Sequence, residues 1–464
     1  MVFSTTLFLF FYFPLVLAVY LLLPWRWRNL WLFAVNLVFY GWGEPVYILL
    51  MLFSIALNYG AGLWIGKYRE TDRCRAKRLL TADIVINLAL LGFFKYYDLF
   101  AGTLSLLPGV RVPRLGLTLP IGISFYTFQT MSYPIDVYRG DSAPQRSFIR
   151  FGTFVALFPQ LIAGPIVRYK DVAAQLGFRP GSPEQFASGV RRFTVGLAKK
   201  VLIANNIGLL WDVYAAKAPS ELTVLGAWMG ICAFTLQIYF DFSGYSDMAI
   251  GLGRMLGFEF LENFNYPYIS RSVTEFWRRW HISLGTWFRD YVYIPLGGNR
   301  RGLKRQLLNI LIVWALTGFW HGANWTFLCW GLYYAVFLML EKVFLLRRLE
   351  RVPVLATLYT LIVAICGWVM FDLDSMAAAF GYYRAMFGGG AGLLNRTDLF
   401  YLKNYAAVFL TAAVAATPLG KRLYDRLPER ARSLATPPLL LAALVLSTAY
   451  LVDATYNPFL YFRF

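Results

Sequence analysis

The sequence predicts an all-α, polytopic membrane protein, on the basis of its composition, its recurring apolar segments and the placement of its basic residues. Of the 464 residues, 58% are hydrophobic, 18% are aromatic and only 15% are charged. Soluble domains carry roughly a quarter of charged residues, so this chain has the composition of a protein that faces lipid. We expect a single integral-membrane domain over residues 1–464.

Apolar segments of helix-spanning length recur from one end of the chain to the other. They lie near residues 7–23, 30–42, 46–65, 83–107, 119–135, 151–166, 222–240, 306–340, 354–371, 404–418 and 437–452. Because about 20 residues are needed to cross a bilayer, the shorter ones predict re-entrant segments. The first segment follows no basic residue and ends without a small-residue cleavage pattern, so we expect a retained helix.

The basic residues lie in short connectors between these segments, although the net charge of +19 is large. They form no continuous face for nucleic acid, and cytoplasmic connectors of a membrane protein explain them better. Parity then places both termini, and a polar connector at about 372–403, outside the cytoplasm. Residues 136–300 do not fit this pattern, so we expect irregular or in-plane helices there, lining a cavity.

The chain has only two histidines, and each follows a tryptophan: Trp280-His281 and Trp320-His321. Two histidines without a clustered third ligand make a poor metal site, so we predict none. The four cysteines are far apart and are expected to be packing thiols. No nucleophile elbow or P-loop is present.

The first histidine lies in a segment, residues 272–298, that predicts an amphipathic helix. Ser272 and Glu275 have the spacing of a capping box, so the helix should begin there. At 100° per residue, aromatic side chains including Trp277 and Trp280 share one side, while Arg278 and Arg289 lie opposite. The alternative is an interfacial helix with lipid-facing arginines.

The second histidine lies between small residues, Gly318 and Gly322, which leave room for a substrate or for a close helix. A helix starting near Arg305 carries His321 about 24 Å inward, past the midplane of a core about 30 Å thick. Either histidine alone reads equally well as a hydrogen-bonded core residue. Two of them, with no others in the chain, favour function.

A third polar segment, residues 237–253, interrupts an apolar run. Its polar side chains are Asp241, Ser243, Tyr245, Ser246 and Asp247. Intramembrane carboxylates are costly unless paired. They are expected either to orient an imidazole or bind substrate hydroxyls, or to form an interhelical pair with an arginine or a capped helix break.

These segments resemble the membrane-bound O-acyltransferase family, in the bacterial branch of alginate and peptidoglycan O-acetyltransferase membrane subunits and teichoic acid D-alanyl transfer proteins. The resemblance covers residues 119–141, 158–168, 239–253, 262–300 and 316–331. It implies a helix bundle thinned at its centre, with a tunnel whose two funnels meet near His321. His281 falls on the family's second position, a His or Asn after Trp. The resemblance further implies transfer of acetyl from cytoplasmic acetyl-CoA to an extracytoplasmic acceptor, with a separate secreted transferase as partner, in the bacterial inner membrane.

The chemistry expected from the residues agrees with that implication. A buried imidazole stays neutral and can accept a hydroxyl proton, so His321 is the expected base and His281 orients the thioester or the oxyanion. The residues expected to bind the donor phosphates are Arg278, Arg279 and Arg289, and those expected to orient substrate include Trp280, Trp320 and Asn324. No permanently bound cofactor is expected. Alternatives are D-alanyl transfer from a carrier protein, or a transporter of acylated intermediates.

Overall fold

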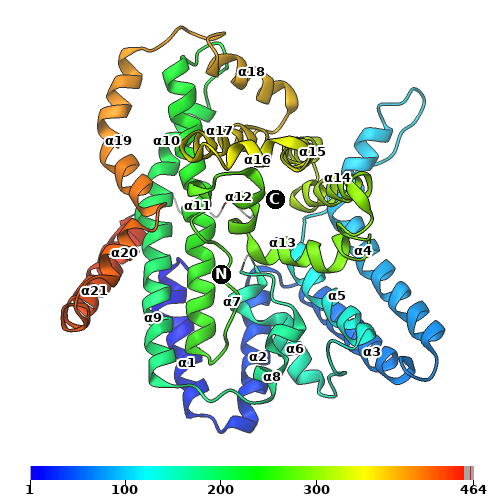
Figure 1. Ribbon diagram of the computed structural model, residues 1–464. Helices are drawn as coiled ribbons and strands as arrows, with labels where there is room; N and C mark the ends of the chain where they lie inside the picture. The colour runs from blue at the N-terminus through cyan, green and yellow to red at the C-terminus, as the bar shows by residue number, and fades with distance from the viewer. Residues whose placement is uncertain (1, 163, 454–459, 461–464) are drawn as a thin grey trace. The chain divides into compact units, whose positions relative to one another are not determined.

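The computed structural model describes residues 2–162, 164–453 and 460, and regular structure in these ranges is helical, without strands (Figure 1). Within these ranges, seven helices are long and apolar enough to cross a membrane. An eighth span is present if α19 (Arg396–Ala415) and α20 (Leu419–Asp425), bent by 64° at their junction, cross as one. The prediction of an all-α, multi-pass membrane protein is confirmed.

The chain forms two compact units, each described here by itself. The first contains residues 1–193 and 246–261, and the second contains residues 194–245 and 262–464. The first unit has the helices η1 (Phe8–Tyr12), α1 (Phe13–Leu22), α2 (Trp25–Gly43), α3 (Ile48–Tyr68), α4 (Arg73–Leu104), α5 (Ile123–Arg139), α6 (Phe148–Ala156), α7 (Phe158–Leu161), α8 (Tyr169–Gly177) and most of α9 (Pro183–Ala198).

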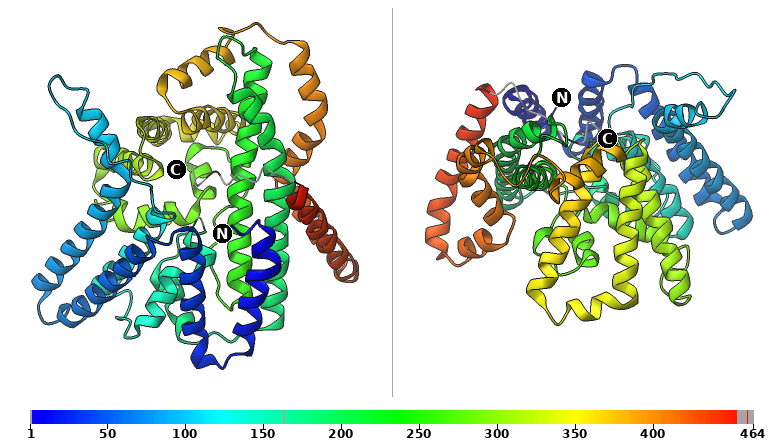
Figure 2. Two further views of the ribbon diagram at one scale, coloured as in Figure 1. Left: turned by 180° about the vertical axis from the view of Figure 1, so that it is seen from behind. Right: turned by 90° about the horizontal axis from the view of Figure 1, so that it is seen from above.

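Within the first unit, α3 packs against α4 and α5. Helices α3 and α4 lie side by side in both views of Figure 2. Asn58 of α3 donates to Asn87 of α4 across 3.1 Å, and both side chains are buried. Since lipid offers no hydrogen bonds, such an interhelical amide pair stabilises the contact between the two helices.

The second unit carries the segments on which the two histidines lie. Its helices are η2 (Lys199–Ala204), α10 (Asn205–Ala215), most of α11 (Val224–Met255), η3 (Pro267–Ile269), α12 (Val273–Arg279), α13 (Ile282–Phe288), η4 (Arg289–Tyr293), α14 (Gly302–His321), α15 (Trp325–Leu340), η5 (Glu341–Leu345), α16 (Leu346–Leu349), α17 (Pro353–Asp372), α18 (Met376–Met386), α19, α20 and α21 (Glu429–Asp453). The connector predicted at 372–403 is mostly helical, because α18 and the first turns of α19 form there.

The apolar run 306–340 is divided between two closely packed helices, α14 and α15. A Cβ atom on Gly318 would lie 2.4 Å from the carbonyl oxygen of Phe327, and one on Gly331 would lie 2.3 Å from that of Trp314. The small residues therefore permit close backbone approach. Gly322 likewise faces the ring of Phe327, so the room predicted beside His321 is taken by a helix.

One candidate span was not predicted from the sequence. Residues Pro183–Ala215 form a helix of 33 residues whose most apolar window is 61% buried. Lys199 and Lys200 interrupt its apolar pattern. Lys200, however, is 1% exposed and paired with Asp241 of α11, so its charge is neutralised inside the unit. A hydropathy pattern cannot record such a pair, because the partner lies on another helix.

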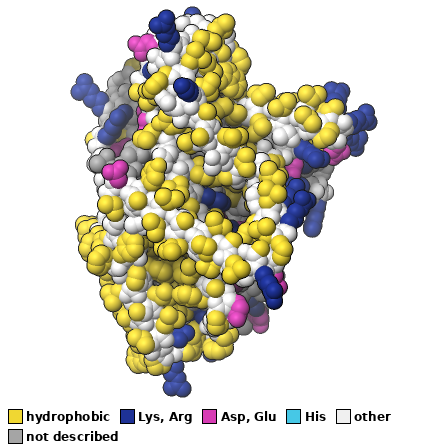
Figure 3. Space-filling model, turned by 90° about the vertical axis from the view of Figure 1, so that its left-hand side faces the viewer, with side chains coloured by type: hydrophobic (Ala, Val, Ile, Leu, Met, Phe, Trp, Pro, Cys, Tyr) yellow, Lys and Arg dark blue, Asp and Glu magenta, His cyan; other side chains and the backbone are white. Residues whose placement is uncertain are grey.

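The surface has the character expected of a protein in lipid. Hydrophobic side chains cover most of the face drawn in Figure 3, and the charged ones gather in small groups. On α21 only 6% of the most apolar window is buried, with Leu434 76% and Leu441 62% exposed. Exposed leucines in such number on one helix are typical of contact with acyl chains.

Candidate active site

The segment around His281 is a broken helix, which corrects the prediction of one amphipathic helix over residues 272–298. The predicted start is right, because the Ser272 hydroxyl accepts from the backbone N–H of Glu275 at 3.0 Å. The helix then ends after seven residues. His281 has a left-handed backbone, with φ of 47°, which turns the chain before α13 begins. A left-handed residue cannot continue a right-handed helix.

Asn263 holds this turn in place. Its side-chain oxygen accepts from His281 Nδ1 at 3.1 Å, from the backbone N–H of Ser283 at 3.2 Å and from the Ser283 hydroxyl at 2.9 Å. Its backbone oxygen accepts from the N–H of Ile282. The sequence analysis missed Asn263 and expected an acidic side chain to orient an imidazole, since no local pattern links positions 18 residues apart.

The environment of His281 defines its protonation. The side chain is 2% exposed, and burial lowers the pKa of His281 from 6.5 to about 3. The imidazole is therefore neutral at physiological pH. Because the amide oxygen of Asn263 only accepts, Nδ1 carries the single ring proton and Nε2 carries the lone pair.

The two imidazoles share one aromatic neighbour. The Trp320 ring centroid lies 5.9 Å from that of His281 and 5.0 Å from that of His321. Phe242 of α11 completes the surroundings of His281 at 4.7 Å. Trp330 at 4.9 Å and Phe371 at 5.3 Å surround His321, which is 4% exposed. The two histidines singled out in the sequence are therefore brought together around a single indole.

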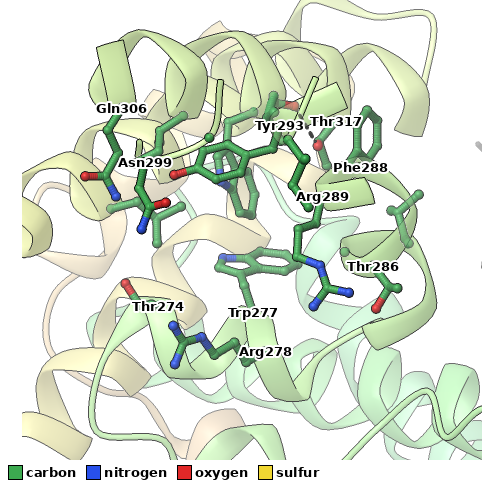
Figure 4. A pocket seen from close by; sticks show the side chains of 18 of the residues that line it. Thr274, Trp277, Arg278, Thr286, Phe288, Arg289, Tyr293, Asn299, Gln306 and Thr317 are labelled. Carbon is green, nitrogen blue, oxygen red and sulfur yellow. Dashed lines mark hydrogen bonds between the residues drawn. The ribbon is translucent and has the colours of Figure 1, made fainter. Parts of the chain in front are cut away.

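A cavity of about 980 Å³ reaches this cluster. It is formed by α12, α13, η4, the following turns and one side of α14, and both Trp280 and His281 line it, whereas His321 does not. Figure 4 shows Arg278, Arg289, Tyr293, Asn299 and Gln306 arranged around the indole of Trp277 in this cavity. The cavity thus combines polar groups with a flat aromatic surface.

The charge of the cavity lining is entirely positive. The cationic residues that line it are Arg278, Arg289, Arg300, Arg301 and Lys342, and no aspartate or glutamate is among the lining residues. Arg289 pairs with its neighbour Asp290 at 2.8 Å. Within the described residues, the other four cations have no carboxylate partner within 4 Å. Guanidinium groups without carboxylates favour an anionic ligand such as a phosphate.

The structure separates the three arginines predicted to bind the donor. Arg278 and Arg289 line the cavity together with Trp277, although the continuous-helix interpretation placed them on the opposite side from the aromatic residues. Arg279 does not line it. Its guanidinium pairs with Glu275 at 2.8 Å and donates to the backbone oxygen of Asn265 at 3.1 Å.

The carboxylates of the polar segment on α11 form ion pairs. The expected arginine partner is found for Asp247, whereas the partner of Asp241 is a lysine. In the second unit, Asp241 pairs with Lys200 and accepts from the backbone N–H of Leu460 at 3.0 Å. In the first unit, Asp247 pairs with Arg192 at 2.6 Å. Ser243 and Tyr245 are buried, at 1% and 0% exposure.

Asn324 has a local structural role. Its side-chain oxygen caps α15 by accepting from the N–H of Thr326 at 3.2 Å, and its amide donates to the backbone oxygen of Asp374 at 2.7 Å.

Among the described residues no group of three His, Cys, Asp or Glu side chains could hold a metal ion.

Known proteins resemble this chain over most of its length. The model of the membrane-bound O-acyltransferase family matches residues 142–373, which include both histidines and the whole cavity lining. A probable alginate O-acetylase of Azotobacter vinelandii is 43% identical over 439 residues, which cover 92% of this chain and 86% of the relative. Another from Pseudomonas aeruginosa is 45% identical over 86% of this chain and 78% of its own. A peptidoglycan O-acetyltransferase of Helicobacter pylori is 35% identical over 88% of this chain and 83% of its own.

Proposed function

Since this chain belongs to the membrane-bound O-acyltransferase family and is a membrane O-acyltransferase, we propose that it transfers acetyl from cytoplasmic acetyl-CoA to a polymer outside the cytoplasm. The acceptor is a hydroxyl of an exopolysaccharide or cell-wall polymer, reached across the bacterial inner membrane, with a secreted transferase as partner. The names of its relatives support an acetyl group and a polymer acceptor.

The observation that carries the proposal is the cation-lined cavity that ends at His281. Coenzyme A carries several phosphate charges and an adenine ring, so it needs cations and a flat apolar surface. Arg278 and Arg289 supply the first and Trp277 supplies the second. Among the described residues that line the cavity, none is a carboxylate that would repel the phosphates.

In the proposed reaction, His321 acts as the base. The acceptor oxygen attacks the thioester carbon while its proton passes to the imidazole. The carbon–sulfur bond then breaks, and the leaving thiolate takes the proton back. The protein aligns the two reactants beside the Trp320 ring and excludes water, which would otherwise compete with the acceptor and hydrolyse the thioester.

The hydrogen bond to Asn263 limits which of the two expected roles His281 can have. A neutral imidazole whose one proton is donated to Asn263 has no second N–H to give to an oxyanion. It can accept a hydrogen bond through Nε2, for example from an amide N–H of the pantetheine arm. Of the two roles expected for His281, orienting the thioester is therefore the one we propose.

The proposed function is tested by measuring polymer acetylation in membranes supplied with acetyl-labelled acetyl-CoA. The membranes contain either the wild-type chain or the His321→Ala variant. Loss of the base should lower polymer acetylation by about 10²- to 10⁴-fold. D-alanyl carrier protein is supplied in parallel. Labelling from the carrier alone would identify a D-alanyl transferase. Unchanged acetylation by His321→Ala, with movement of an acylated lipid abolished, would identify a transporter.

A further inference from the structure

Glu341 is a buried acid in an apolar helical segment. It is 1% exposed and begins η5, inside the candidate span Trp325–Leu349. An acidic side chain at such a place is expensive and calls for a specific set of partners. It does not line the cavity, although its neighbour Lys342 does.

The partners of Glu341 are the first residues of α12. One carboxylate oxygen accepts from the N–H of Val273 at 2.6 Å. The other accepts from the N–H and the hydroxyl of Thr274, at 2.8 and 2.7 Å. Ser272 accepts the next two backbone N–H groups, those of Glu275 and Phe276. The bond from Phe276 is the first ordinary bond of the helix, whereas the N–H groups of Val273, Thr274 and Glu275 are among those that an isolated helix leaves open at its start, and Glu341 accepts two of these three.

α12 depends on such anchors because it has only seven residues. Helices this short are not stable alone. Its apolar contacts, such as the Trp277 ring 4.7 Å from that of Trp314, hold it against its neighbours but specify its register less closely than hydrogen bonds do. Directional bonds fix its register at both ends: Glu341 at the start, and the backbone of Asn265 and Asn263 just beyond its end.

We propose that Glu341 is a positioning residue for acyl transfer, which sets the place of His281 through α12 without touching either substrate. The inference rests on the proposed function, in which Arg278 binds the donor and His281 orients the thioester. α12 carries Arg278 and leads directly into His281. A shift of about 1 Å in a positioned group can lower a rate about a hundredfold. The contact between Glu341 and α12 joins residues 68 positions apart.

The experiment compares Glu341→Gln with Asp398→Asn. Asp398 is a matched control: it is equally buried, caps α19 through the N–H of Asn395 and accepts from Thr223 and Tyr214, away from the cavity. Rates are measured with acetyl-CoA in membranes, per mole of folded protein, together with thermal unfolding of the detergent-solubilised chains.

We expect both variants to unfold at lower temperature and only Glu341→Gln to lose kcat, by tenfold or more. Its KM for acetyl-CoA should rise less than that of an Arg278→Ala variant, because all the cations that line the cavity, Arg278 included, are still present. A kcat within threefold of wild type, or an equal loss in Asp398→Asn, would overturn the proposal.

If Glu341→Gln fails to fold, Glu341→Asp keeps the charge but shortens the side chain that reaches Val273 and Thr274, and it decides the question. It should lower kcat severalfold, and an unchanged kcat would count against the positioning role. Should the wild-type chain use another donor, the same comparison is made with that donor, so the donor assignment and the role of Glu341 fail separately.

Discussion

Arg278 and Arg279 are adjacent in sequence and have the same side chain, yet the structure gives them different surroundings. Arg278 lines the cavity without a carboxylate partner among the described residues, whereas Arg279 is paired with Glu275 at 2.8 Å. The cause is the short helix α12, which separates neighbouring side chains by about 100°. One of them therefore faces the cavity and the other faces the chain around Asn265.

Replacing Arg278 by alanine should weaken donor binding. A hydrogen bond to a charged group contributes about 1.5–3 kcal/mol, so KM for acetyl-CoA should rise about tenfold to a hundredfold. Arg279→Ala is the matched control and should leave KM within about threefold, because its pair with Glu275 is a half-exposed one. Initial rates at varied acetyl-CoA measure both. Equal KM values for the two variants would contradict the donor site.

His281 should make the stability of the protein sensitive to acid. Burial lowers the pKa of His281 from 6.5 to about 3, so between these values the unfolded chain binds a proton that the folded chain does not. Unfolding then takes up a proton, and stability falls as the pH falls from 6.5 towards 3. Above pH 6.5 the imidazole is neutral in both states, so this contribution is constant there.

Thermal unfolding at pH 7.0, 6.0 and 5.0 in detergent measures this effect, with His281→Asn as the control. Asparagine tolerates the left-handed backbone better than most residues and does not titrate. The wild-type Tm should fall more steeply with decreasing pH than the Tm of the variant. Parallel curves would show that His281 is not buried as a neutral group.

At the scale of elements, the pair between Lys200 of η2 and Asp241 of α11 holds two helices of the second unit together. Both side chains are almost fully buried, at 1% and 2% exposure. In addition, a Cβ atom on Gly244 would lie 2.7 Å from the backbone oxygen of Gly196, so these helices approach closely. Close backbone approach and a buried pair together define this contact.

Removing the charge of one partner should lower the stability of the protein. Replacing both partners by apolar residues should not. Asp241→Asn leaves a buried lysine without its counter-charge, which typically costs about 3–5 kcal/mol. The double variant Lys200→Met/Asp241→Leu should recover most of the stability and, because both Asp241 oxygens have structural partners, acyl transfer as well. Thermal unfolding and acetylation assays test both. A double variant that regains stability but does not transfer acetyl would show that Asp241 has a role in binding substrate.

Element boundaries followed the sequence where the signal was local. Ser272 and Glu275 correctly predicted the start of α12, because capping involves residues three apart. The end of α12 was missed, because periodicity continues through Trp280 and His281 and gives no sign of a left-handed residue. The division of residues 306–340 into α14 and α15 was not predicted either, since mainly apolar residues lie on both sides of the break at residues 322–324.

At the scale of the whole molecule, the described residues contain long apolar helices and a smaller set of short helices that carry the site. Seven candidate spans have the length and hydropathy for crossing, whereas α12 and α13 have seven residues each. Short irregular elements at membrane depth are tolerated only where protein or a water-filled cavity surrounds them. The short helices α12 and α13 both line the cation-lined cavity, so the site and the irregular region coincide.

The sequence by itself determined the fold class, the multi-pass character, the family and the two histidines. Composition and hydropathy need no knowledge of packing, and a chain with two histidines offers few alternatives. Only the tertiary structure decided that Asn263 holds His281, that Arg278 and not Arg279 faces the cavity, and that Glu341 anchors α12. These contacts join residues 18 to 68 positions apart. Such contacts depend on how helices pack, which no local pattern of residues records.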